Sequence, residues 1–276
     1  MKKSICHYSL HRTWRTQKWT CLQLAEHVKS LGCEGIDFHA GLMGSTEGAA
    51  RNIKDALKKT GLTLSGLSLG NNFNQEDTAL FKEQVDTVKA WLEVAAEVKA
   101  PVSRIFVGHI KDRSNKEQLQ RGFELIFAGL GQVVKAAEKL GVVLALENHG
   151  GLPCTGEEQV DVIKKINSKN LRATVDVGNY LQGGQEAHVG SAIAAAYCSY
   201  VHFKDFRKTP SQNSSLPWGL QACIVGAGDV DHLKCLTALK KAGYNGFVAL
   251  EYEGPEDEQI GVPQSLEFMN KVMKGF

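Results

Sequence analysis

The sequence predicts an α/β protein of the (β/α)8 TIM-barrel class. Three observations lead to this class: eight short apolar runs of strand length, amphipathic helical stretches between them, and a length of 276 residues, which suits eight βα units. A doubly wound sheet would show the same alternation, and periodicity alone does not separate the two. Because no linker or shift in composition divides the chain, we expect residues 1–276 to form a single domain.

The expected strands are short apolar runs, of the kind found in parallel strands that are buried on both faces. In chain order they are "SICHYSL" (4–10), "GIDFHA" (35–40), "LTLSGLSL" (62–69), "SRIFVGHI" (103–110), "VVLALEN" (142–148), "RATVDVG" (172–178), "SYVHFKD" (199–205) and "FVALEYE" (247–253).

Helical stretches such as "CLQLAEHVKSLG", "DTALFKEQVDTVKAWLEVAAEVK" and "LIFAGLGQVVKAAEKLG" fill the intervals between the strands. Several of the intervals end at a glycine, the preferred residue just after a helix, namely Gly32, Gly61, Gly141 and Gly243. One long irregular stretch covers 207–228, and a loop of that length in a compact domain is more often functional than idle.

The composition excludes several classes of protein. Lysine and arginine number 32 against 30 acidic residues, without a long basic run, so no nucleic-acid partner is expected. No apolar stretch approaches the roughly 18 residues of a membrane span, and the first residues lack the apolar core of a signal peptide. Seven cysteines without a CxxC pair indicate reduced thiols, so we expect a cytoplasmic location.

Four polar side chains stand at the ends of the last four expected strands. They are Glu147, Asp176, His202 and Glu251, separated by 29, 26 and 49 residues, the last interval being lengthened by the long loop. The carboxyl ends of barrel strands converge at one mouth, where the chemistry of such folds takes place. An acidic residue at a strand end can also cap the next helix or pair with a lysine, but four consecutive ends favour a shared site.

Three carboxylates and an imidazole are a ligand set for a divalent metal. Hard oxygen ligands favour Mn²⁺, with Mg²⁺, Co²⁺ and Zn²⁺ as alternatives. The sequence therefore predicts one divalent ion bound by Glu147, Asp176, His202 and Glu251.

Further polar residues are candidates for contacting a substrate at the mouth. His7, His39 and His109 lie on or at the ends of the first, second and fourth strands, and together they suit a polyhydroxylated ligand. Lys204 and Arg207 follow His202, where they could neutralise developing oxyanion charge, or simply form salt bridges at the surface. The glycines of "GAGDVD" (226–231) precede an expected helix, where free N–H groups could hold a phosphate.

The motifs "ENHGG", "DVGN", "HFKD" and the closing "GAGDVDHLKCLTALKKAGYNGFVALEYEG" resemble the xylose isomerase-like sugar phosphate isomerase/epimerase superfamily. Its members include ketose 3-epimerases, inosose dehydratases and endonuclease IV. The resemblance covers nearly the whole chain and is strongest over 142–254. It implies the same metal ligands: Glu147, Asp176, His202 and Glu251.

The resemblance also implies a reaction. A metal that chelates a carbonyl and its neighbouring hydroxyl stabilises the enediolate formed when the α-proton leaves. In the ketose 3-epimerases a pair of glutamates moves protons on opposite faces of the substrate, and this role falls on Glu147 and Glu251. The expected protein is a divalent-metal-dependent isomerase or epimerase of a sugar or sugar derivative. Its partner is a small carbohydrate, and self-association to a homo-oligomer stays open.

Two residues depart from the epimerase pattern. Asn179 stands where the epimerases and endonuclease IV have a histidine; an amide hydrogen-bonds but does not titrate, so Asn179 is a candidate substrate contact. His149 lies two residues after Glu147, on the same face of an extended strand, where it would be a general base with a pKa near working pH.

These departures keep other functions open. A single base, His149, suits elimination, so a lyase acting on an inosose or on a 3-keto sugar or glycoside is the alternative. An endonuclease with three metals is disfavoured by Asn179 and by the small net charge. A barrel that only binds carbohydrate is disfavoured by the intact set of four ligands.

Overall fold

Eight parallel strands close into a barrel in the computed structural model, which describes residues 1–110, 112–210 and 219–276. The strand order is β1-β10-β7-β6-β5-β4-β3-β2, so the (β/α)8 class is confirmed and a doubly wound sheet, which has two open edges, is excluded. The barrel strands are β1 (Lys2–Cys6), β2 (Gly35–His39), β3 (Thr63–Leu69), β4 (Ser103–Ile105), β5 (Leu144–Glu147), β6 (Leu171–Asp176), β7 (Cys198–Phe203) and β10 (Phe247–Leu250).

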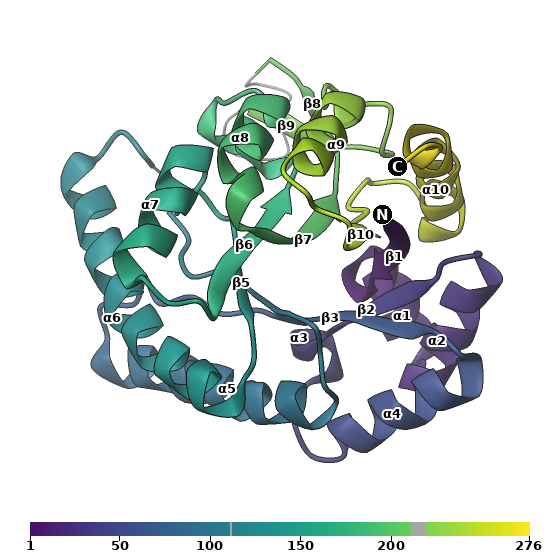
Figure 1. The fold of residues 1–276 in the computed structure, drawn as a ribbon, viewed down its shortest axis with the longest axis horizontal. Helices are drawn as coiled ribbons and strands as arrows, with labels where there is room; N and C mark the ends of the chain where they lie inside the picture. The colour runs from purple at the N-terminus through teal and green to yellow at the C-terminus, as the bar shows by residue number, and fades with distance from the viewer. Residues whose placement is uncertain (111, 211–218) are drawn as a thin grey trace.

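Helices surround the barrel, with α4, α5, α6 and α7 forming much of its outer layer in the view of Figure 1. The helices are α1 (His11–Gln17), α2 (Cys21–Ser30), α3 (Ala40–Met43), α4 (Ala49–Thr60), α5 (Thr78–Glu97), α6 (Lys116–Leu140), α7 (Gly156–Ile166), α8 (Ala187–Ala194), α9 (His232–Lys241) and α10 (Glu258–Met273). Within the described residues, the 3-10 helices that connect these elements include η1 (His7–Leu10), η2 (Asn179–Gly183) and η3 (Ala195–Tyr197).

Two of the expected strands, 4–10 and 103–110, end four and five residues earlier than the sequence pattern indicates. The run 4–10 divides into β1 and η1, because Ser9 Oγ donates to Leu250 O and accepts from Tyr252 N, which holds this turn against the end of β10. The run 103–110 forms a strand only as far as Ile105. Beyond it, the main chain bonds to loops instead of strands: Val107 O accepts from Phe73 N.

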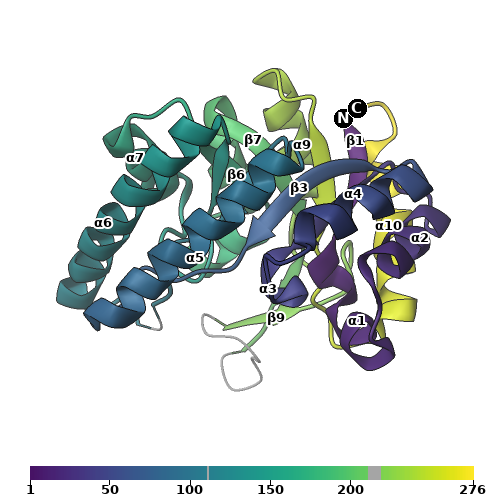
Figure 2. The same cartoon turned by 90° about the horizontal axis from the view of Figure 1, so that it is seen from below.

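The irregular stretch expected over 207–228 contains regular structure. Strands β8 (Phe206–Lys208) and β9 (Leu220–Ala222) pair antiparallel as a hairpin, while residues 211–218 of the expected loop lie outside the described residues. The hairpin extends away from the barrel in Figure 2.

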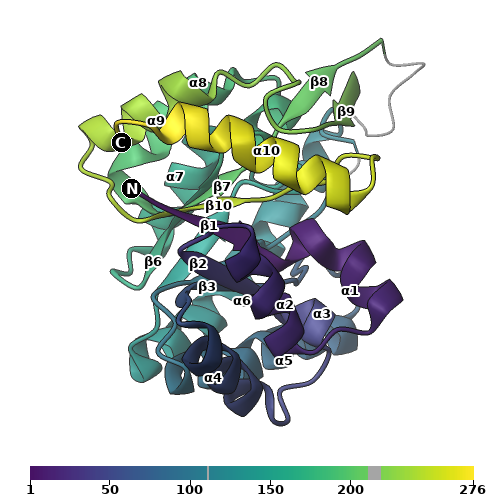
Figure 3. The same ribbon diagram turned by 90° about the vertical axis from the view of Figure 1, so that its right-hand side faces the viewer.

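The chain ends meet where the barrel closes. β1 pairs with β10, and Lys2 N donates to Gly246 O. The two termini lie side by side in Figures 1, 2 and 3. No helix in the described parts of the chain is long and apolar enough to cross a membrane.

The barrel interior is layered, and the layering positions the site. One layer is a small apolar cluster of Val102, Ala145, Tyr200 and Ala249. Because side chains two residues apart share a face of a strand, the next inward positions on β5, on β7 and after β10 form a layer closer to the mouth. These positions are Glu147, His202 and Glu251.

Candidate metal centre

Four predicted ligands meet at the mouth of the barrel. Glu147, Asp176, His202 and Glu251 each offer a ligand atom, these atoms lie within 4.8 Å of one another, and all four residues are buried. They come from the ends of β5 and β6, from β7 and from the residue after β10. The structure therefore brings together the set that the strand ends predict.

An amide bridge fixes the ends of β5 and β6. Asn148 Nδ2 donates to Asp176 O at 2.9 Å, and Asn148 Oδ1 accepts from Asp176 N at 3.0 Å. The Asn148 side chain thus continues the hydrogen bonding between β5 and β6 one residue beyond the end of β5. The Asp176 carboxylate is held as well, with Oδ1 accepting from Gly178 N and Asn179 N, and Oδ2 accepting from Asn179 Nδ2 at 2.8 Å.

The His202 ring connects the ligands to a carboxylate on the other side of the barrel. Its Nδ1 lies 3.2 Å from Glu147 Oε1 and 3.3 Å from Glu251 Oε2, while its Nε2 lies 3.5 Å from Asp37 Oδ2. Ser68 Oγ donates to the same Asp37 oxygen at 2.6 Å. A carboxylate behind the imidazole is the usual way in which proteins orient a metal-binding histidine. The sequence analysis did not identify Asp37, although an acidic residue inside the apolar run "GIDFHA" can indicate a functional carboxylate.

Two buried cations balance the carboxylates. Arg104 Nε lies 3.2 Å from Glu147 Oε2, and Lys204 Nζ lies 2.6 Å from Glu251 Oε2 and 3.3 Å from Asp176 Oδ2. Both side chains are only 2% exposed. Charges so far from water persist only when they are paired. Arg104 was also missed, and its signal is the single charge within the strand run "SRIFVGHI".

These charges set the protonation of the ligands. Burial raises the pKa of Glu147, but Arg104 and His202 outweigh burial and lower it to about 2. The pKa of Glu251 also lies well below its usual range, because Lys204 and His202 outweigh burial. The pKa of Asp176 lies well above its usual value, because burial there exceeds the effect of Lys204. A cation bound at this point would relieve the cost of ionising Asp176.

The donor set fits a divalent cation. Glu147 Oε2 and Glu251 Oε2 are buried and pair with the charges of Arg104 and Lys204, but neither oxygen accepts a hydrogen bond of normal geometry from a described residue. Lone pairs of this kind, beside an imidazole nitrogen and the Asp176 carboxylate, are what Mn²⁺ or Mg²⁺ takes as ligands.

His149 lies close to this cluster, in the loop after β5. Its ring stacks on Phe106, with centroids 4.2 Å apart, and its Nδ1 has no hydrogen-bond partner among the described residues. Burial lowers the pKa of His149 to about 4, with Lys204 and Arg104 adding to the effect and Glu147 opposing it. The expectation of a pKa near working pH is therefore wrong: the ring stays neutral, but it is a weak base.

Five of the remaining predicted substrate contacts lie either near the ligands or at the surface. Asn179 and Lys204 touch the ligand carboxylates, and His39 is buried nearby, where Arg104 and the site acids influence its titration. His109 is exposed, and Arg207 is exposed with its guanidinium donating to Ala227 O.

His7, the last predicted substrate contact, directly follows the carboxyl end of β1. It belongs to η1, is fully buried, and packs edge-on against Trp14 with centroids 4.3 Å apart. The segment 226–231, a possible phosphate site, already binds a carboxylate of the protein. The N–H groups of Gly226, Gly228 and Val230 donate to the Asp205 carboxylate, so they are not free for an anion.

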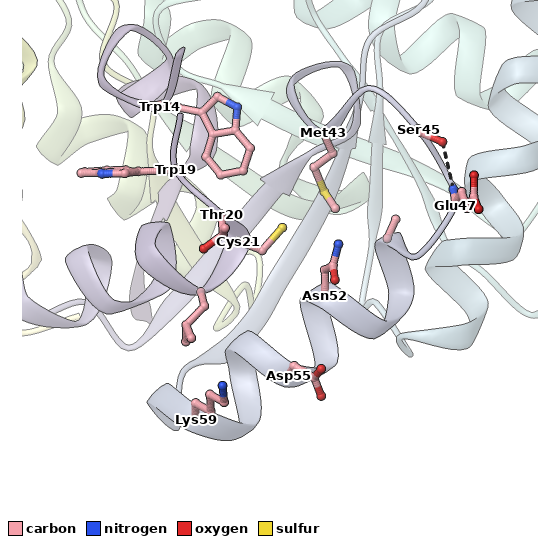
Figure 4. A pocket seen from close by; sticks show the side chains of 12 residues that line it. Trp14, Trp19, Thr20, Cys21, Met43, Ser45, Glu47, Asn52, Asp55 and Lys59 are labelled. Atoms are coloured by element: carbon pink, nitrogen blue, oxygen red, sulfur yellow. Dashed lines mark hydrogen bonds between the residues drawn. The ribbon is translucent and has the colours of Figure 1, made fainter. Parts of the chain in front are cut away.

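A separate cavity of about 410 Å³ lies between α2 and α4 (Figure 4). Trp14, Trp19 and Met43 line one part of it, and Asn52 and Asp55 of α4 line another. None of the predicted site residues lines this cavity, so it is distinct from the candidate metal centre.

Comparison with curated proteins finds two distant relatives. The chain is 24% identical over 180 residues to the uncharacterised protein MJ1311 of Methanocaldococcus jannaschii, covering 64% of this chain and 59% of that protein. It is 21% identical over 201 residues to an inosose isomerase of Halalkalibacterium halodurans, covering 71% of this chain and 68% of that protein. The chain thus spans less than two thirds of the first relative's length.

Solved structures match over nearly the whole chain. A D-tagatose 3-epimerase-like protein superposes with a TM-score of 0.77 at 18% identity, covering 99% of this chain and 97% of that one. The probable 3-DHS dehydratase AsbF of Bacillus anthracis superposes with a TM-score of 0.74 at 15% identity, covering 98% of this chain and all of that one (100%). At these identities the likeness shows the fold alone.

Comparison with models of protein families assigns the chain to a family. The model described as xylose isomerase-like TIM barrel matches residues 25–272, which include every strand of the barrel except β1 and all four candidate ligands. The chain is a member of the xylose isomerase-like TIM barrel family.

Proposed function

We propose that the protein is a divalent-metal-dependent isomerase or epimerase that acts on a sugar or sugar derivative. The observation that carries the proposal is the convergence of Glu147, Asp176, His202 and Glu251 within 4.8 Å at the barrel mouth. These four residues would hold the metal, and Mn²⁺ is the ion that we expect first. When bound, such an ion supplies Lewis-acid polarisation of a substrate carbonyl.

Two glutamates in the cluster would move the protons. Glu147 ends β5 and Glu251 follows β10, and β6 and β7 separate these two strands in the barrel order. Carboxylates on separate strands can face a sugar from two sides, so one removes the proton next to the carbonyl and the other returns a proton to carbon. The low pKa of Glu147 makes it a weak base, so the reaction depends on an acidified α-proton.

The surrounding polar groups would support this chemistry. The Lys204 ammonium, in contact with Glu251, stabilises negative charge that develops on substrate oxygens. Asn179 holds Asp176 by its side-chain amide, and His202 is oriented by Asp37. None of these three groups needs to transfer a proton itself.

Metal analysis tests the ligand set. Protein purified with Mn²⁺ should hold one ion per chain, and Asp176→Ala should lose both the ion and the activity. Chelation should lower the melting temperature of the wild type but not of Asp176→Ala, because an ion bound only to the folded state stabilises it. Glu258→Gln, which alters a buried carboxylate on α10, should keep the ion. Full occupancy in Asp176→Ala would remove that residue from the site.

A lyase acting on an inosose or a 3-keto sugar is the second candidate. The observation in its favour is His149, a neutral ring beside the cluster whose Nδ1 receives no hydrogen bond in the part of the chain that the structure describes. Its pKa of about 4 makes it a weak base, but the pKa values of Glu147 and Glu251 are also lowered, so basicity does not separate the two candidates.

Proton chemistry separates the two candidates. Keto sugars and inososes incubated with protein and Mn²⁺ in D₂O should give an isomer that carries deuterium on carbon, detected by NMR. A lyase would instead give an enone with strong ultraviolet absorbance. His149→Ala should lose about 10²–10⁴-fold in rate if the ring is the base, and far less if Glu147 and Glu251 move the protons. An enone together with an inactive His149→Ala variant would establish the lyase.

A further inference from the structure

The Lys204 ammonium lies among three carboxylates, and two of them are candidate metal ligands. Its Nζ is 2.6 Å from Glu251 Oε2, 3.3 Å from Asp176 Oδ2 and 3.3 Å from Glu253 Oε1. A divalent cation held by Asp176 and Glu251 would draw on oxygen atoms that Lys204 already contacts. Two positive charges would then compete for the same oxygens.

Lys204 has little room to leave. The side chain is 2% exposed, so a move into water is blocked by its surroundings. A Cβ at Gly178 would lie 3.1 Å from Lys204 Cγ, which shows that the lysine stem packs directly on the main chain after β6. The ammonium therefore needs a carboxylate partner within the site.

Glu253 is the carboxylate contact of Lys204 that the metal would not claim. Among the described residues, Lys204 forms ion pairs with Asp176, Glu251 and Glu253. The Glu253 side chain is 27% exposed, whereas the two ligand carboxylates are nearly inaccessible, so Glu253 lies toward the open side of the cluster.

We propose that Glu253 is a positioning residue that holds the Lys204 ammonium beside the ligand carboxylates, so that a divalent cation and the lysine occupy the site together. This inference rests on the proposed metal-dependent function. Glu253 acts through Lys204 and is not itself a ligand. The arrangement retains a fixed positive charge next to the metal, where it can face substrate oxygens.

A double-mutant cycle read by Mn²⁺ affinity tests the proposal. Isothermal titration of wild type should show one site. Glu253→Gln should bind Mn²⁺ about 10- to 100-fold more weakly, the range found when a residue supporting a metal site is lost. In a Lys204→Met background the same substitution should change affinity less than about threefold, because no ammonium is left to hold.

Two controls keep the result interpretable. Glu256→Gln removes a carboxylate from the same loop that bonds to Tyr252 Oη and not to Lys204, and it should leave Mn²⁺ affinity within about twofold. If Lys204→Met fails to fold, Lys204→Gln provides the second background.

Each failure has its own signature. If wild type binds no Mn²⁺, the proposed function fails before Glu253 is tested. If wild type binds but Glu253→Gln is unchanged, or loses as much affinity in both backgrounds, the positioning role of Glu253 is overturned while the metal site stands.

Discussion

At the scale of single residues, the groups behind the ligands determine what the ligands can do. Asp37 lies on β2, far from His202 in sequence, yet its carboxylate faces the ring nitrogen that points away from the cluster. This contact, together with the hydrogen bond from Ser68, leaves Nδ1 free to face Glu147 and Glu251. The orientation of the ring therefore depends on strands β2 and β3 as much as on β7.

Replacing Asp37 by asparagine should weaken metal binding. An amide keeps the shape of the carboxylate but loses its charge, so it orients the imidazole less firmly. We expect Asp37→Asn to bind Mn²⁺ about 10- to 100-fold more weakly in calorimetric titration. Ser68→Ala, which removes only a hydrogen bond to Asp37, should have a smaller effect. Unchanged affinity in Asp37→Asn would show that the ring is held by other contacts.

At the scale of elements, the segment after β3 packs closely against α6. Phe73, in the segment after β3, packs on the helix at Gly129, and its N–H donates to Val107 O after β4. A Cβ at Gly129 would lie 2.4 Å from the Phe73 ring, so only glycine permits this approach. Gly131, two residues later in the same helix, has no atom of the described residues within 4 Å of the equivalent position.

The two glycines should respond in opposite directions to alanine. Gly129→Ala should lower the free energy of unfolding by about 1–3 kcal/mol, because the added methyl overpacks against Phe73. Gly131→Ala should raise it by up to about 1 kcal/mol, because alanine is the better helix former and meets no clash. Urea denaturation of both variants checks this pair, and equal stabilisation of both would disprove the tight contact at Gly129.

At the scale of the whole molecule, closing the barrel buries titratable groups whose protonation is then linked to folding. Burial lowers the pKa of His39 to about 4, with Arg104 adding to the effect while Asp37 and the two glutamates oppose it. An unfolded chain would bind a proton at this histidine below about pH 6.5, whereas the folded barrel does not until about pH 4. Between these values the unfolded state holds more protons, so stability must fall as the pH falls.

Substituting His39 should remove this part of the acid sensitivity. The linkage amounts to about 2–3 kcal/mol between pH 7 and pH 4.5. The free energy of unfolding, measured with urea at several pH values, should therefore decline more steeply for wild type than for His39→Gln. Above pH 7 the two curves should run parallel, because the histidine is neutral in both states. Parallel curves at all pH values would show that His39 titrates normally.

The sequence by itself determined the barrel and the meeting of its four candidate ligands. Strand length and the alternation with helices are local properties, set by apolar runs and by helix-ending glycines such as Gly141. Once eight parallel strands close, their carboxyl ends must share one mouth. Polar residues at the ends of neighbouring strands, among them Glu147 and Asp176, then come together as a consequence of topology.

The tertiary structure alone decided what surrounds these ligands. In strands buried on both faces, apolar runs do not reveal which side chains point inward, so the inward positions of Asp37 and Arg104 depended on strand register. Strand ends likewise depended on distant partners: Ser9 bonds to the end of β10, which makes residues 7–10 a helical turn and buries His7. Such contacts join residues far apart in the chain, and local pattern carries no information about them.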